Sequence, residues 1–68
     1  MKLIRLSVNL NEDTAAALKE AAENDGITAT ETVRRAISLY KLARDEAAVG
    51  SRLQIKHRDG KISDLVIL

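Results

Sequence analysis

The sequence predicts a small α+β domain that consists of a short strand, two helices and a C-terminal β-hairpin. Residues 3–10 alternate apolar and polar side chains, which is the period of a strand. Residues 12–48 follow helical spacing, and alternation returns after residue 50. The glycines lie at the changes of period, namely at Gly26, Gly50 and Gly60, so we expect one unit over residues 1–48 and an extension over residues 49–68.

The length and composition of the chain favour association of two copies. Sixty-eight residues without a cysteine are near the size at which a single core is barely sufficient. The apolar residues are aliphatic or alanine apart from one Tyr, so few side chains can each bury a large area. A homodimer with a shared core would relieve this shortage.

Composition also bears on compartment and charge. No signal peptide and no apolar run of membrane-spanning length are visible, so we expect a cytoplasmic protein with no membrane partner. The net charge is +1, but residues 1–30 carry three Lys/Arg against five Asp/Glu, whereas the remainder carries eight against five. Any attraction for an anionic partner must therefore be local.

The first predicted element is a strand over residues 3–10 with two different faces. One face carries apolar side chains, namely Leu6, Val8 and Leu10. The other carries side chains that can hydrogen-bond a base edge, namely Arg5, Ser7 and Asn9. Because a lone strand is unstable in water, this segment needs a neighbouring strand.

A helix over about residues 12–24 follows this strand. Asn11 can cap it, and Glu12 and Asp13 occupy the first turn, where the helix dipole favours negative charge. Gly26 can supply the left-handed residue after its C-terminus. Its inner face has a single large apolar residue, Leu18, among alanines, so it allows close packing but contributes little core.

The second helix is predicted from Ala29 to about Ala48. Thr28 and Glu31 have the spacing of a capping box, which marks its start. Its main apolar stripe is formed by Val33, Ile37 and Tyr40, and Ala36, Leu39 and Ala43 lie beside it, so the apolar band is wide enough to contact two neighbours. On the exposed side, an i,i+4 ion pair is expected between Lys41 and Asp45.

The last segment reads as a hairpin with strands over residues 51–57 and 61–68. A three-residue loop, Arg58-Asp59-Gly60, with Gly60 left-handed, pairs Leu53 with Leu65 and Ser51 with Ile67. This register gathers apolar side chains on one face, namely Leu53, Ile55, Leu65 and Ile67. Residues 65–68 are apolar on both faces, so we expect a partner or the helices to cover them.

The order of these elements resembles the ribbon-helix-helix family of prokaryotic repressors, of the Arc, MetJ and CopG type. The resemblance covers about residues 2–44. It rests on the segment Arg5-Leu6-Ser7-Val8-Asn9-Leu10 and, about sixteen residues later, on Gly26-Ile27-Thr28-Ala29-Thr30-Glu31. The hairpin after Gly50 is not accounted for by this resemblance.

The resemblance implies an intertwined homodimer in which two antiparallel strands form a ribbon that enters the DNA major groove. By position, Arg5, Ser7 and Asn9 would read bases, and a two-fold axis near Ser7 would place Arg5 opposite Asn9 of the other chain. The expected dimer core combines the inner ribbon face with the helical stripes: Leu6, Val8, Leu10, Leu18, Val33, Ile37 and Tyr40.

The resemblance also implies DNA phosphate contacts. Family members hold a phosphate on the backbone amides at the start of the second helix, which corresponds here to Thr28, Ala29 and Thr30. Lys2 precedes the ribbon and is a further candidate for a phosphate contact.

The resulting expectation is a transcriptional repressor that binds a double-stranded DNA operator, its own or that of a plasmid or phage function. One alternative is an antitoxin in which residues 50–68 contact a toxin, although such tails are usually loosely folded when free. Another is an α+β interaction module that binds no DNA, in which the N-terminal strand pairs with the hairpin.

An enzyme is not expected. The sequence has no nucleophile–base pair, no Gly-rich phosphate loop and no cluster of metal ligands, and His57 has no Cys or His neighbour. We therefore expect no catalytic residue, metal or cofactor. For the hairpin, we favour a role in higher-order assembly or core coverage over contact with the DNA flanks.

Overall fold

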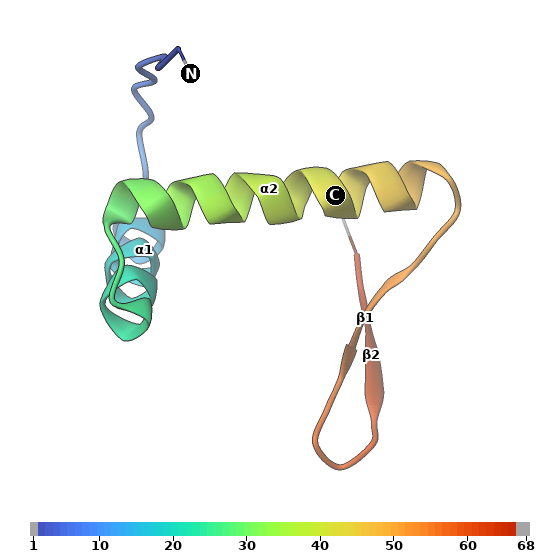
Figure 1. The fold of residues 1–68 in the computed structure, drawn as a ribbon. Coiled ribbons are helices and arrows are strands. Elements are labelled where there is room, and N and C mark those ends of the chain that lie inside the picture. Colours follow the sequence, from blue (N-terminus) through green and yellow to red (C-terminus); the bar gives the residue numbers. More distant parts are fainter. Residues whose placement is uncertain (1, 67–68) are drawn as a thin grey trace. The chain divides into compact units, whose positions relative to one another are not determined.

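The computed structural model describes residues 2–66 and shows a small α+β chain (Figure 1). Its elements are α1 (Glu12–Asp25), α2 (Ala29–Ala48), β1 (Leu53–Lys56) and β2 (Ile62–Leu65). The chain divides into two compact units, with the boundary inside α2 between Val33 and Arg34. The predicted α+β class is confirmed, and the predicted limits of both helices agree with the structure to within one residue.

Helix α1 is closed at both ends by short-range hydrogen bonds. The backbone N–H of Thr14 donates to Oδ1 of Asn11 at 2.8 Å, so Asn11 is the N-cap as predicted. At the other end Gly26 adopts φ +65°. The N–H of Gly26 donates to the Glu23 carbonyl, and that of Ile27 to the Ala22 carbonyl, which is the Schellman pattern.

Helix α2 begins and ends in the same local manner. The N–H of Glu31 donates to Oγ1 of Thr28 at 3.0 Å, which confirms Thr28 as the N-cap. Gly50, at φ +85°, ends the helix, and the N–H of Ser51 donates back to the Glu46 carbonyl. The expected pair between Lys41 and Asp45 is present at 2.5 Å, where both side chains are exposed, so it stabilises α2 by only a few tenths of a kcal/mol.

The hairpin has the register that the sequence predicts. β1 and β2 pair antiparallel with Leu53 opposite Leu65 and Ile55 opposite Ser63. The N–H of His57 donates to the Lys61 carbonyl, which leaves residues 58–60 as the three-residue loop. Gly60 adopts φ +91° there, a conformation that side chains with a Cβ rarely take. The predicted pair between Ser51 and Ile67 lies outside the described residues.

The predicted N-terminal strand is not formed in the single chain. Residues 2–10 have no regular secondary structure, and the described sheet consists of β1 and β2. The physical reason is that an extended segment is stable only when a neighbouring strand satisfies its backbone N–H and C=O groups. The prediction of a ribbon concerns two chains, and it stays a prediction.

The described residues bury very little. Only Ala22 and Ala43 fall in the buried class, with 7% and 3% of their surface exposed. Both are small, so the described residues bury no large apolar side chain. The helices therefore depend on their caps and on local hydrogen bonds, because no hydrophobic core stabilises them within the described chain.

The Asn11 cap yields a direct stability prediction. Replacing Asn11 with Ala removes the acceptor for the Thr14 N–H, and we expect the free energy of unfolding to fall by about 1 kcal/mol. Urea unfolding followed by helical circular dichroism measures this change. Asn11→Asp keeps an acceptor oxygen and serves as the matched control. Equal losses in both variants would contradict the capping role.

Candidate nucleic-acid interface

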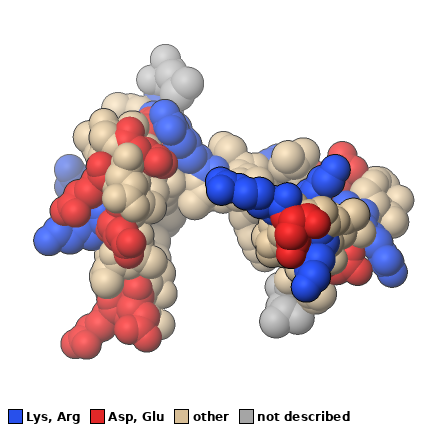
Figure 2. All heavy atoms as spheres, turned by 90° about the horizontal axis from the view of Figure 1, so that it is seen from below, with Lys and Arg blue, Asp and Glu red and all other residues tan. Residues whose placement is uncertain are grey.

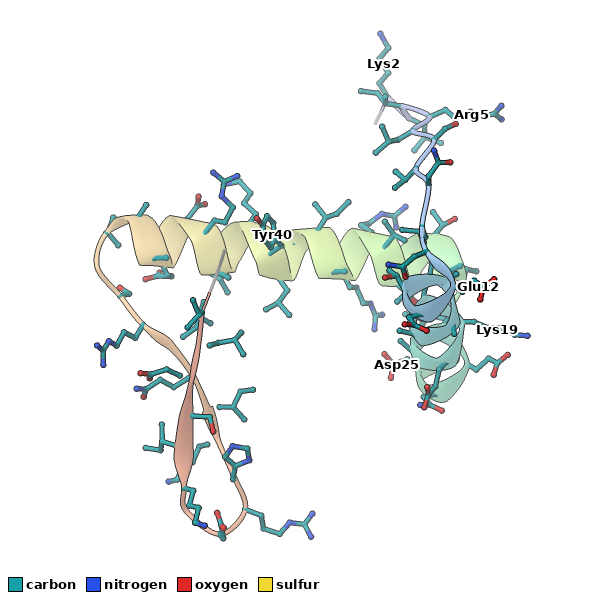
Figure 3. All side chains as sticks on the ribbon, turned by 180° about the vertical axis from the view of Figure 1, so that it is seen from behind. Lys2, Arg5, Glu12, Lys19, Asp25 and Tyr40 are labelled. Carbon is teal, nitrogen blue, oxygen red and sulfur yellow. The ribbon has the colours of Figure 1, made fainter. Side chains whose placement is uncertain are left out.

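The three side chains predicted to read bases are all presented to solvent by the N-terminal segment. Arg5, Ser7 and Asn9 are exposed, and in the described part of the chain their side chains form no hydrogen bond or ion pair. Figure 3 shows Lys2 and Arg5 extending away from the backbone of this segment. Arg5, Ser7 and Asn9 alternate with apolar residues along the sequence, which would place them on one face of a strand. In the single chain, however, residues 2–10 do not form that strand.

The apolar side chains of the same segment are also uncovered. The exposed fraction is 76% for Leu6, 63% for Val8 and 45% for Leu10. Fully burying a side chain of this size stabilises a structure by about 1.5–3 kcal/mol. The segment therefore carries polar groups suited to recognition together with apolar groups that have no cover within the described chain.

The start of α2 holds the second predicted set, Thr28, Ala29 and Thr30. The Oγ1 of Thr28 accepts a hydrogen bond from the Glu31 N–H and so caps the helix. The hydroxyl hydrogen of Thr28 can still donate a hydrogen bond to a ligand. All three residues are exposed, and the first amides of a helix have no acceptor inside it. These amides lie at the positive end of the helix dipole, where an anion is favoured. The Glu31 carboxylate lies in the same turn and opposes part of that attraction.

The helical part of the predicted dimer core is open in the single chain. Leu18 is half-buried, whereas Val33, Ile37 and Tyr40 are exposed, with fractions of 40%, 56% and 51%. Sequence periodicity placed the last three residues on one stripe of α2, but no other part of the described chain buries that stripe. The prediction that they form a core is met only if a second chain covers them.

One apolar feature of α2 was not identified from the sequence. Leu42 is exposed by 54%, and Val49, the residue that follows α2, by 77%. Together with Leu39, which the sequence places beside the main stripe, they form a second stripe. The spacing of these residues, i, i+3 and i+10, was a signal that could have found it. This second stripe lies away from the stripe that begins at Val33.

Charge is distributed unevenly between elements. Helix α1 carries five carboxylates and one lysine, whereas the hairpin carries cations around its turn. Figure 2 shows a group of acidic side chains over one part of the surface and acidic and basic side chains interspersed over the rest. The acidic surface of α1 is electrostatically unfavourable for contact with DNA phosphates.

Other kinds of site find no support in the part of the chain that is described. Residues 2–66 contain no group of three His, Cys, Asp or Glu side chains arranged to hold a metal ion. His57 is exposed, and its Nε2 lies 2.8 Å from Oγ of Ser63 on the neighbouring strand. Among the described helices, none is long and apolar enough to cross a membrane.

Comparison with family models, curated proteins and solved structures finds no match to this chain. The functional argument therefore depends on the residues themselves, on the two capped helices and on the apolar surfaces that the single chain leaves open. These surfaces are found on the N-terminal segment, on α2 and on the hairpin.

The unpaired N-terminal segment leads to a prediction about exchange. If a second chain supplies the neighbouring strand, amide hydrogens within residues 3–10 should be protected only at concentrations where the chain is dimeric. Hydrogen–deuterium exchange across a dilution series measures this. Amides of α1 provide an internal control, because the caps of α1 are local. Protection of residues 3–10 that is the same at every concentration would contradict pairing between chains.

Proposed function

We propose that this protein is a homodimeric, sequence-specific DNA-binding regulator, a transcriptional repressor of the ribbon-helix-helix type. The observation that carries the proposal is the N-terminal segment, where Leu6, Val8 and Leu10 alternate with Arg5, Ser7 and Asn9 and nothing in the described chain covers or pairs it. A second copy meets both requirements, because it supplies a strand for the backbone and an apolar face for the leucines and valine.

The width of such a ribbon supports DNA as the ligand. Two antiparallel strands fit the major groove, where each base pair presents a distinct set of donors and acceptors. Arg5 can donate two hydrogen bonds to guanine, and Asn9 can form a bidentate contact with adenine. Each contact would discriminate by about 1–3 kcal/mol, whereas the short hydroxyl of Ser7 would contribute less.

Phosphate contacts at the start of α2 would fix the ribbon on the duplex. The exposed amides of Ala29 and Thr30 and the hydroxyl of Thr28 are donors at the positive end of a helix. Lys2 would add a contact that does not depend on sequence. Because the net charge is only +1, we expect weak non-specific binding and a strong dependence of function on the base contacts.

The alternatives receive less support. The hairpin is closed by its own ladder and turn, whereas an antitoxin tail is usually loosely folded when free. In an interaction module without DNA, the N-terminal strand would pair with the hairpin, but the described sheet contains only β1 and β2. The DNA-binding regulator is the proposal that explains both faces of the N-terminal segment, the apolar face by dimerisation and the polar face by contacts with bases.

Selection of bound sequences from a random DNA pool tests this function. We expect Arg5→Ala and Asn9→Ala each to lose preference at particular base pairs by about 1–3 kcal/mol, since each removes a base contact. Lys2→Ala is the control, because losing a phosphate contact weakens all sequences about equally and lowers the salt slope by about 1 per chain. An unchanged sequence preference in both ribbon variants would refute the proposed base readers.

A further inference from the structure

The second apolar stripe of α2 lies on one side of the helix with charges of opposite sign at its two ends. Arg35, Leu39, Leu42, Glu46 and Val49 are spaced i, i+4, i+7, i+11 and i+14, which keeps them on one side. The stripe therefore begins beside a cation and ends beside an anion. The three apolar members are all more than half exposed.

The acidic end of this stripe is strengthened by the helix itself. The last turn of α2 contains no basic residue, so the partial negative charge of its carbonyl end is not offset there. Asp45 already binds Lys41, whereas the carboxylate of Glu46 has no hydrogen-bond or ion-pair partner in the described part of the chain. A cation that approaches this end would be favoured by Glu46 and by the dipole.

The hairpin has the complementary surface. One of its faces is mostly apolar, with Ile55 and Leu65 exposed by 47% and 45% and Leu53 half-buried, and Ser63 lies opposite Ile55 on the same face. The opposite face is mixed. Asp64 accepts a hydrogen bond from Gln54 at 2.7 Å and lies 3.6 Å from Arg52, and Ile62 on the same face is exposed by 59%. A hairpin of two strands is marginal in water, so its apolar face needs a cover.

The turn of the hairpin is cationic. Lys56, Arg58 and Lys61 surround it and form no ion pair in the described part of the chain. The nearby Asp59 is used locally, since its Oδ1 accepts the Lys61 N–H at 3.0 Å. The hairpin thus ends in a cluster of positive charge, here called the basic tip, formed by Lys56, Arg58 and Lys61. Lys61 has the register of the face that carries Ile55, whereas Lys56 pairs with Ile62 on the other face.

We infer that the apolar face of the hairpin packs on the Leu39–Leu42–Val49 stripe of a second copy, with its basic tip at the Glu46 end. The lengths match, because residues 39–49 of a helix span about 15 Å, and the five residues from Leu53 to the turn span about 17 Å. Apolar side chains then meet apolar side chains, and the basic tip meets the acidic end.

The charges favour docking of the hairpin on α2 of a second copy over docking on α2 of its own chain. Within one chain the hairpin joins α2 at its C-terminal end, so folding it back would place its base beside Val49 and its basic tip beside Arg35. That arrangement brings like charges together, and within this unit α2 is not packed against β1 or β2. A hairpin from another copy can run in the opposite direction, which brings the basic tip to Glu46. The inference goes beyond the proposed function, since it needs a second copy but no DNA.

Cross-linking tests the inference. Because the sequence has no cysteine, a thiol reagent reacts only at the introduced positions. In the variant Glu46→Cys with Lys61→Cys, a short bis-maleimide should join two chains, seen as a covalent dimer on a denaturing gel. Glu20→Cys with Lys61→Cys is the control for collision and for docking on the acidic helix α1. We expect at least a several-fold lower dimer yield from this control. Equal yields from the two variants would overturn the inference.

A third variant, Arg35→Cys with Lys61→Cys, reports on the hairpin's own helix. An internal link in that variant, seen by mass spectrometry as a monomer that carries one linker joined to both thiols, would overturn docking on a second copy. Failure of Glu46→Cys with Lys61→Cys to link at all would do the same. Helical circular dichroism of each variant before cross-linking verifies that α2 is intact.

Exchange of the two charges provides a second measurement that does not need cross-linking. We expect Glu46→Lys and Lys61→Glu each to weaken self-association about two- to five-fold per contact, and the double variant to recover most of the loss. Sedimentation equilibrium measures the dissociation constants. Additive losses in the double variant would contradict the contact. The base-reading variants Arg5→Ala and Asn9→Ala do not touch this surface, so failure here and failure of the DNA proposal are distinguishable.

Discussion

An extended segment is not stable without a neighbouring strand, and the structure of the N-terminal segment depends on this constraint. Backbone N–H and C=O groups in a strand need a neighbouring strand, and residues 2–10 have none in the single chain. The helices are under no such constraint, because Asn11, Gly26, Thr28 and Gly50 close their ends with bonds to nearby residues. Bonds within the chain thus form the helices and the hairpin, whereas residues 2–10 have no neighbouring strand in the described chain.

The same division explains what the sequence could predict. The limits of α2 and the pairing of Leu53 with Leu65 were predicted correctly, since a cap, a left-handed glycine and a short loop are properties of adjacent residues. The strand over residues 3–10 and the core around Ile37 involve contacts that a single chain does not make, so they stay predictions. The exposed Leu42 and Val49 were not predicted as a stripe, because residues 43–48 between them include no large apolar residue and the pattern is sparse.

In the proposed assembly each surface has a separate task. The N-terminal segment joins two chains and reads bases, the start of α2 holds the phosphate backbone, and the hairpin covers a second copy without touching DNA. The acidic residues of α1 are compatible with this arrangement, because they keep that helix away from phosphates. Dimerisation and recognition would therefore depend on the same short stretch, and a substitution at Val8 would be expected to affect both.

The central claim is that two chains share a strand ribbon centred near Ser7. Isotope-filtered nuclear Overhauser spectroscopy on a mixture of labelled and unlabelled protein detects contacts between chains alone. The account predicts intermolecular Hα–Hα contacts within residues 3–10, arranged symmetrically about Ser7. Finding that this segment contacts only residues 53–65 of its own chain, or no strand at all, would contradict it.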